Sequence, residues 1–428
     1  MDDLLRTPRG TRDIVGDEAE LFEYLTTTFK EVAKRNGFKP IITPTIEFFE
    51  LFARKSGVEI VKSMYVFKDK AGRTLALRPE LTASVIRAYL KSLRNEPKPI
   101  LLYYVGQCFR YEEPQRGRYR EFWQAGLEVI GEKGVHGDLR VFNVMEQFFN
   151  EIKLKHYYII GNVGIYRMFM NAFNIPGNEQ DQILHLIDKE MFNEAINYAK
   201  KYGDEAAEVI SKLISMNIED LENMAMDYKE LVKNYMDRLL GEIRDTIEFI
   251  DILKELGYDV RYKPSLVRGL AYYTGIIYEV KTSVLDISIG GGGRYDNLTT
   301  VYGGPPEYST GVAIGIDRVM LALSELNIKP LDKDRVKAAI LLLNDSKEYL
   351  IYAYKVSSLL QTAGITTLVL SGRKLSKMLS YANRFKFKYA VIIGSKELNE
   401  NKVSIKDLDT GVQEYIELEK INEFIKNI

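Results

Sequence analysis

Residues 105–131, VGQCFRYEEPQRGRYREFWQAGLEVIG, bring arginines, carboxylates and an amide into one short stretch. Two runs with strand character flank a turn-rich tip, which predicts an antiparallel hairpin with a loop longer than a tight turn. Because side chains alternate faces along a strand, Arg118, Gln124 and Glu128 share one face of the second arm, and Arg110 ends the first arm. Such a surface suits a ligand with phosphates at one end and an amine or ring N–H at the other. The simpler alternative is a hairpin with one solvated face.

Two further stretches carry charged groups near a predicted helix start. Residues 77–83, LRPELTA, place a proline where a helix can begin, so Glu80 and Thr82 stand at its N-terminus just past a strand end. An acidic residue there is also favoured by the helix dipole, which requires no ligand. Residues 311–323, GVAIGIDRVMLAL, predict a strand, a glycine turn and an apolar-faced helix with Arg318 in its first turn. Without other information, this arginine is an ordinary surface residue.

Tyrosines and glycines cluster in another pair of segments. Residues 266–280, LVRGLAYYTGIIYEV, contain Arg268 and predict a strand with Tyr272 and Tyr273 on opposite faces. Residues 283–298, SVLDISIGGGGRYDNL, predict a strand that runs into four glycines, where the backbone could approach a ligand closely. The sequence has no P-loop pattern, and no clear βαβ unit follows the glycines, which disfavours a dinucleotide or phosphate loop.

Composition and charge limit the possible functions. The chain has 428 residues, enough for two or three domains, and its net charge of -1 means that any nucleic-acid contact must depend on local basic patches. With one cysteine and three scattered histidines, neither a disulfide nor a metal site built from these residues is expected. No secretory leader is evident, and no apolar run reaches the ~20 residues of a membrane helix. We therefore expect a cytoplasmic chain without a membrane partner.

Changes in composition divide the chain into four segments. Residues 1–164 and 257–328 mix strands and helices, whereas residues 165–256 predict a mostly helical insertion. In residues 329–428, short apolar strands alternate with helices, which predicts a small α/β domain with a parallel sheet. Within it six cations, uninterrupted by acidic residues, are interleaved with aromatic residues, so RNA contact is as good an interpretation as a solvated face. These cations are Arg373, Lys374, Lys377, Arg384, Lys386 and Lys388.

The motifs resemble those of class II aminoacyl-tRNA synthetases, and in particular of the histidyl-tRNA synthetase family. F-R-x-E followed by G-R-x-R-E-F-x-Q-x-x-x-E resembles motif 2 of the class. R-G-L-x-Y-Y-T-G and G-G-G-R-Y-D are similar to the two histidine-specific motifs. The opening P-x-G-T-R-D, the proline-bearing stretch 38–57 and residues 311–323 resemble the family's start, motif 1 and motif 3. The resemblance implies an α+β fold: a catalytic domain on an antiparallel sheet, a helical insertion and a C-terminal α/β anticodon-binding domain.

The resemblance also implies an activity and a set of site residues. The chain would activate L-histidine with ATP to histidyl-adenylate and pyrophosphate, then transfer histidine to the 3′ adenosine of tRNA(His). Catalytic roles fall to Arg110 and Arg268; a homodimer is implied, and Mg²⁺ is expected with the substrate ATP, without an assigned protein ligand. The implied histidine-binding residues are Glu80, Leu81, Thr82, Arg110, Gln124, Glu128, Arg268, Tyr272, Tyr273 and Tyr295. The implied ATP-binding residues are Arg110, Arg118, Arg268 and Arg318. The implied tRNA-binding residues are Arg116 and the six C-terminal cations.

Two departures from the family pattern affect details of the pocket. Ala271 stands where the family usually has an acidic residue, and Asn297 stands where it usually has a glycine. Two other functions are possible. A regulatory paralogue that partners ATP phosphoribosyltransferase typically loses histidine-motif residues and the C-terminal domain, both of which this sequence keeps. A class II synthetase for another amino acid is disfavoured by the two histidine motifs.

Overall fold

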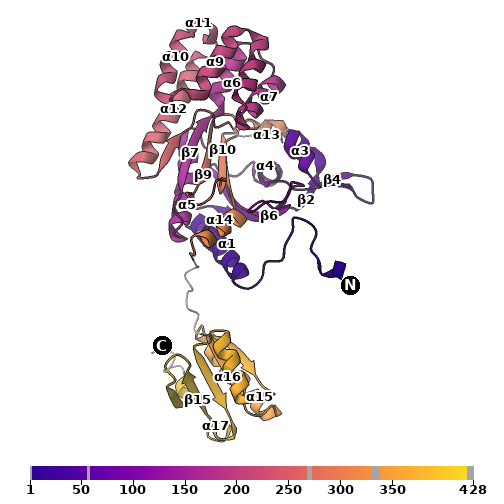
Figure 1. The fold of residues 1–428 in the computed structure, drawn as a ribbon, viewed down its shortest axis with the longest axis vertical. Helices are drawn as coiled ribbons and strands as arrows, with labels where there is room; N and C mark the ends of the chain where they lie inside the picture. The colour runs from indigo at the N-terminus through magenta and orange to yellow at the C-terminus, as the bar shows by residue number, and fades with distance from the viewer. Residues whose placement is uncertain (1, 55–57, 268–271, 329–336, 422–428) are drawn as a thin grey trace. The chain divides into compact units, whose positions relative to one another are not determined.

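The computed structural model describes the chain except for residues 1, 55–57, 268–271, 329–336 and 422–428 (Figure 1). The chain forms two compact units, Met1–Pro330 and Leu331–Ile428. The first unit contains an eight-stranded sheet and a separate three-stranded sheet, and the second contains a five-stranded sheet. Among the helices of the described residues, none combines the length and the apolar character that crossing a bilayer requires.

The eight-stranded sheet has the order β1-β5-β6-β11-β10-β9-β7-β8. Its neighbours pair antiparallel, except that β1 with β5 and β7 with β8 pair parallel at the two edges. The predicted antiparallel sheet is therefore confirmed. Its strands are β1 Lys39–Pro40, β5 Ile100–Phe109, β6 Glu121–Ile130, β7 Tyr157–Asn162, β8 Val260–Tyr262, β9 Ile276–Lys281, β10 Gly290–Arg294 and β11 Ser309–Gly315.

The predicted hairpin is β5 with β6, and it supplies two central strands of this sheet. The two strands pair from Ile100 opposite Ile130 to Phe109 opposite Glu121. Apolar odd-numbered residues of β6 are buried in a core shared with three helices, which leaves the other face of the hairpin for polar groups. These helices are α1 Asp17–Arg35, α5 Val135–Glu151 and α14 Ile316–Glu325.

The three-stranded sheet leads into the helix that carries the predicted glutamate and threonine. Its order is β2-β4-β3, and Asp69 closes the β3–β4 turn by accepting the backbone N–H groups of Ala71 and Arg73, both at 2.9 Å. Helix α4 begins at Thr82, so Glu80 precedes the first turn instead of lying within it. The elements are β2 Ile46–Phe48, α2 Phe49–Ala53, α3 Val58–Ser63, β3 Val66–Lys68, β4 Thr74–Leu77 and α4 Thr82–Ala88.

Residues 165–256 consist of helices that gather beyond strands β7, β9 and β10 in Figure 1. Their apolar faces share one core with α4 and the pocket tyrosines. The α-helices are α6 Val163–Ala172, α7 Gly177–Asp188, α8 Phe192–Ala199, α9 Asp204–Ser215, α10 Leu221–Asp227, α11 Lys229–Val232 and α12 Met236–Glu255.

The four-glycine run is itself a strand, β10, and the preceding residues 283–289 are not, which reverses the expectation from the sequence. The reason is the tight packing between strands. A Cβ atom on Gly292 would lie 1.9 Å from the carbonyl oxygen of Gly311 on β11, and Gly293 has φ of +152°. Gly292 and Gly293 must therefore be glycine for β10 to pair with its neighbours, whether or not a ligand approaches this strand.

The second unit has a mixed sheet, not the purely parallel one expected. Strands β13, β12 and β14 pair parallel, but β15 and β16 add an antiparallel hairpin at one edge, so the order is β13-β12-β14-β15-β16. The hairpin turns at Asp407, whose side chain accepts the backbone N–H groups of Asp409 and Thr410. The elements are β12 Lys337–Leu342, α15 Lys347–Thr362, β13 Thr366–Leu370, α16 Leu375–Arg384, β14 Tyr389–Ile393, α17 Ser395–Asn399, β15 Lys402–Asp407 and β16 Gln413–Glu417.

Candidate active site

A pocket of about 360 Å³ opens on the polar face of the β5–β6 hairpin, between the start of α4, strands β9 to β11 and the start of α14. Nine of the predicted site residues line it: Glu80, Thr82, Arg110, Arg118, Gln124, Tyr272, Tyr273, Tyr295 and Arg318. Several other polar residues also line it, which the sequence did not single out: Glu112, Tyr119, Asp188, Lys189, Glu279, Ser288 and Asp317. Residues far apart in the chain therefore meet in one cavity.

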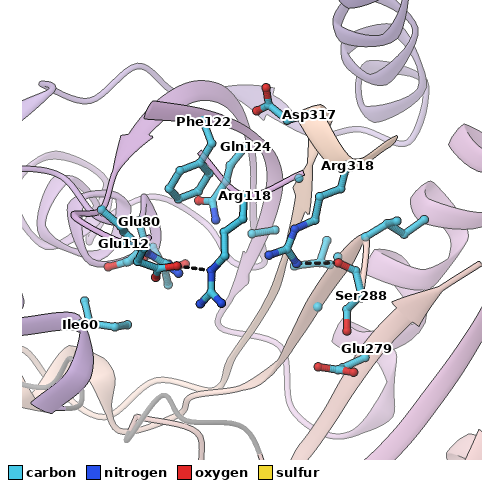
Figure 2. A pocket seen from close by; sticks show the side chains of 18 of the residues that line it. Ile60, Glu80, Glu112, Arg118, Phe122, Gln124, Glu279, Ser288, Asp317 and Arg318 are labelled. Atoms are coloured by element: carbon cyan, nitrogen blue, oxygen red, sulfur yellow. Dashed lines mark hydrogen bonds and ion pairs between the residues drawn. The ribbon is translucent and has the colours of Figure 1, made fainter. Parts of the chain in front are cut away.

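Arginines dominate one region of the pocket. Figure 2 shows the guanidinium groups of Arg118 and Arg318 reaching into the cavity from two different elements. Arg318 donates through Nη1 to the carbonyl oxygen of Ser288 at 2.7 Å, and Arg118 pairs with Glu112. Arg110 donates through Nε to the Pro79 carbonyl at 2.9 Å. Fixed guanidinium groups of this kind suit the oxygens of a polyphosphate.

A carboxylate lies at the start of α4. Glu80 is 4% exposed, and its Oε1 accepts the backbone N–H of Ala83 at 3.0 Å, so it closes the helix end. Burial raises the pKa of the Glu80 carboxyl above its ordinary value, although the N–H groups of Ala83 and Thr82 oppose this shift. A cationic ligand placed here would favour the ionised form of Glu80 and oppose the effect of burial.

Glu128 lies behind the pocket wall and not among its lining residues. Its Oε1 accepts the hydroxyls of Thr82 at 2.8 Å and Tyr104 at 3.2 Å, and its Oε2 accepts the hydroxyl of Tyr295. Burial raises the pKa of the Glu128 carboxyl to about 8, against the effect of these three donors. Glu128 therefore contacts the pocket lining through the hydroxyl groups of Tyr295 and Thr82.

Two glycines make room for this buried network. A Cβ on Gly311 would lie 2.0 Å from Oε2 of Glu128, and a Cβ on Gly126 would lie 2.3 Å from the ring of Tyr104. Tyr104 was missed in the sequence analysis. Counting back by twos from Arg110 along β5 would have placed it on the pocket face of the hairpin.

The thiol of Cys108 fixes another lining residue. Its Sγ lies 3.2 Å from Oε1 of Gln124, and burial raises the pKa of the thiol to about 12. The thiol therefore stays protonated and donates to the amide oxygen. The NH₂ group of Gln124 can then donate to a ligand in the pocket, and the second lone pair of its oxygen can still accept a hydrogen bond.

The pair Tyr272 and Tyr273 differs from the expectation. Both residues line the pocket, whereas strand alternation predicted opposite faces. The reason is that β9 begins only at Ile276, so period two does not apply to residues in the preceding turn. The ring centroids of Tyr272 and Tyr273 are 4.9 Å apart, and Tyr272 packs edge-on against Tyr295 at 5.9 Å.

Besides Glu128, two predicted substrate-binding residues are not part of the described pocket lining. Arg268 lies outside the described residues. Leu81 is 2% exposed, and its side chain belongs to the apolar core beside the pocket.

The predicted tRNA-binding residues lie in both units. Arg116 is exposed in the β5–β6 loop and pairs with Glu325. In the second unit, five of the six cations are exposed and Lys388 is half-buried. They lie on or beside α16, where Tyr381 and Phe385 stack with centroids 4.4 Å apart. Within the described part of the chain, none of these six cations forms an ion pair with an acidic side chain.

The fold and the pocket together define the catalytic domain of a class II aminoacyl-tRNA synthetase. Residues 10–319 match the family model described as histidyl-tRNA synthetase, and residues 337–428 match the model of an anticodon binding domain. The chain belongs to the histidyl-tRNA synthetase family.

Similar proteins support this assignment over the whole length. The histidine–tRNA ligase of Sulfolobus acidocaldarius is 39% identical over 424 residues, which cover 98% of both chains. The structure of apo histidyl-tRNA synthetase from S. aureus is 29% identical with a TM-score of 0.69, covering 98% of this chain and 99% of that one. A histidyl-tRNA synthetase structure from Nostoc sp. PCC 7120 shares the fold, with a TM-score of 0.76 at 23% identity over 99% of each chain.

Proposed function

We propose that this chain joins L-histidine to tRNA(His) in two steps, with the first step in the 360 Å³ pocket. The observation that carries the proposal is the polarity of that pocket. Three arginines (Arg110, Arg118 and Arg318) line it together with the carboxylate of Glu80, so one cavity offers groups for a polyphosphate and for an ammonium ion. ATP supplies the negatively charged polyphosphate, and an α-amino acid supplies the positively charged ammonium group.

In the first step, a carboxylate oxygen of histidine attacks the α-phosphorus of ATP, and the bond from that phosphorus to the bridging oxygen of pyrophosphate breaks. The substrate itself supplies the nucleophile, so the protein contributes position and charge stabilisation. We assign the α-phosphate to Arg110 and Arg268, and the remaining phosphates to Arg118 and Arg318. Mg²⁺ enters as a complex with the substrate ATP.

At the amino-acid end, Glu80 and Thr82 receive the α-ammonium group, with Gln124 beside them. Tyr272 lines the histidine pocket, and Tyr273 and the Glu128–Tyr295 pair read the imidazole. When Glu128 is ionised, Tyr295 donates its hydroxyl hydrogen to it and keeps its oxygen lone pairs for an imidazole N–H. When Glu128 is protonated, it can donate to Tyr295 instead, and the tyrosine hydroxyl then turns its hydrogen to the pocket. Ionised Glu128 therefore selects the histidine-accepting state of Tyr295.

This coupling predicts a pH dependence of histidine binding. Because the pKa of Glu128 is about 8 in the empty pocket, most carboxyls must lose a proton before histidine binds at pH 7. The KM for histidine in ATP–pyrophosphate exchange should fall roughly fivefold from pH 7 to pH 8 and then level off. Glu128→Gln cannot ionise; its KM should be higher at pH 8, by roughly 10- to 100-fold, and should lack this fall.

Free histidine titrates in the same way in assays of wild type and of Glu128→Gln. The variant is therefore the matched control for ionisation of the substrate. A wild-type KM that is flat between pH 7 and pH 9, or a variant with the same pH profile as wild type, would remove Glu128 from histidine recognition. Absence of any histidine-dependent exchange would instead contradict the proposed function.

The second step moves histidine to the 3′ adenosine of tRNA(His). We propose that α16 and its flanking cations in the second unit contact the tRNA, and that Arg116 contacts it near the pocket. Cations without acidic partners next to stacked aromatic rings suit phosphates and bases of RNA.

We also propose a homodimer and a cytoplasmic location. The support for the dimer is a set of exposed apolar side chains: Ile42, two residues after β1, is 97% exposed, Phe48 on β2 is 54% exposed and Val66 on β3 is 46% exposed. Exposed apolar side chains of this size, where they gather on one face, mark an interaction surface.

A further inference from the structure

Arg12 lies in the N-terminal arm, residues 6–16, which precedes α1, and each part of its guanidinium group contacts another side chain. Its Nη1 lies 2.8 Å from Oδ1 of Asp317, and its Nε and Nη2 lie 3.2 and 3.0 Å from Oε1 of Glu18. Its planar face lies over the ring of Tyr119, 4.0 Å from the centroid. The Arg12 side chain is 21% exposed and that of Asp317 is 4% exposed, so this ion pair is largely sheltered from water.

Asp317 connects Arg12 to two parts of the pocket. Its second oxygen, Oδ2, accepts the backbone N–H of Trp123 on β6 at 2.7 Å. It also stands in the first turn of α14, directly before Arg318. Figure 2 shows the Asp317 carboxylate turned away from the guanidinium groups of Arg118 and Arg318, although Asp317 is itself one of the residues that line the pocket.

The other contact of Arg12, Tyr119, directly follows Arg118. The backbone of the arm is docked on the same loop, because the N–H of Arg120 donates to the carbonyl of Gly10 at 2.8 Å. Gly10 has φ of +82°, and a Cβ there would lie 2.6 Å from Cγ of Arg120, so the approach requires glycine. Arg12 thus contacts both segments that carry the phosphate-binding arginines: it pairs with Asp317, directly before Arg318, and it stacks on Tyr119, directly after Arg118.

We infer that Arg12 is a positioning residue for ATP, which holds Arg118 and Arg318 at the spacing that the polyphosphate requires. Arg12 is not among the residues that line the pocket, so it would act through its partners and not by direct contact with ATP. The inference rests on the proposed function, because it assumes that Arg118 and Arg318 bind the phosphates. Arginine is required, since only a planar group with several donors can bond two carboxylates and stack on a ring together.

Removing Arg12 also changes the charge at the pocket. Asp317 lines the cavity, and without its partner it becomes a buried, uncompensated negative charge beside the bound polyphosphate. Loss of Arg12 should therefore weaken ATP binding in two ways, by releasing the two arginines and by adding repulsion. Histidine binding at Glu80 and Gln124 should change little.

The test is ATP–pyrophosphate exchange with Arg12→Met and Arg12→Lys, with ATP and histidine varied separately and active sites titrated. Arg12→Met should raise the KM for ATP about tenfold or more and leave the KM for histidine within about twofold. Arg12→Lys keeps the charge and should give an intermediate value. Arg35→Met is the matched control, because it removes an arginine–carboxylate pair with Glu151 that lies at the surface.

A second variant separates positioning from repulsion. Adding Asp317→Asn to Arg12→Met removes the uncompensated charge and keeps an oxygen for the N–H of Trp123, so part of the ATP affinity should return. The inference is overturned if Arg12→Met leaves the KM for ATP within twofold of wild type. It is also overturned if the variant only loses active sites, with both KM values unchanged. A wild-type chain without histidine-dependent exchange would contradict the proposed function instead.

Discussion

Replacing Arg110 by lysine should lower the kcat of histidine-dependent pyrophosphate exchange by about 10²–10³-fold, with a smaller change in the KM for ATP. Arg110 lines the pocket, donates Nε to the Pro79 carbonyl at 2.9 Å, and stacks on Phe122 at 5.3 Å from the ring centroid. With Nε bonded to the protein, its terminal nitrogens remain for the α-phosphate. Lysine keeps the charge but has one nitrogen and no fixed plane.

Arg140→Lys is the control for this prediction. Arg140 also bonds a carboxylate through two nitrogens, to Glu132 at 2.6 and 3.1 Å, but it does not line the 360 Å³ pocket. Its kcat should remain near wild type. If Arg110→Lys instead raises the KM for ATP and leaves kcat untouched, Arg110 binds the ground state of ATP and does not stabilise the transition state.

Reversing the charge of Arg384, Lys386 and Lys388 to glutamate should lower kcat/KM for tRNA by about 10²-fold or more, and leave pyrophosphate exchange within about twofold. The three residues lie at the end of α16 and in the segment before β14, in a different unit from the pocket. Each phosphate contact adds a salt-dependent contribution to affinity, and reversal replaces attraction by repulsion. Aminoacylation and exchange should be measured on the same preparation at several salt concentrations.

A matched reversal uses Lys347, Lys355 and Lys396, which are exposed in the same unit and change the net charge equally. Its loss in aminoacylation should be much smaller. Equal losses in the two triple variants would show that the effect is one of overall charge. Unchanged aminoacylation after reversal of the α16 group would show that this surface does not bind tRNA.

The sequence is most informative where local pattern and register decide the structure. The β5–β6 hairpin, the β11–α14 junction with Arg318 and the pocket face of Gln124 all follow from period-two alternation and from turn residues. The fold class was also predicted, because the resemblance to class II synthetases covers nearly the whole chain. For the hairpin, the β11–α14 junction and Gln124, the residues that determine the structure are near neighbours in the sequence.

The sequence is least informative where tertiary contacts decide the structure. Glycine-rich β10 is a strand only because β11 approaches it so closely, and no propensity scale predicts that. Tyr272 and Tyr273 both reach the pocket because they precede β9, and strand boundaries are the least certain part of any such prediction. The bond between Arg12 and Asp317 joins residues at opposite ends of the first unit, so nothing local indicates it.

The central claim is that this pocket activates histidine with ATP, and pyrophosphate exchange measures that step without tRNA. The folded chain should be incubated with ATP, Mg²⁺ and labelled pyrophosphate, and each of the standard amino acids should be tested separately. We expect label to enter ATP with histidine and to stay at background with every other amino acid, since a site that bonds both ring nitrogens rejects analogues that lack them by roughly 10⁴–10⁵. Exchange with a different amino acid, or no exchange with histidine, would contradict the account.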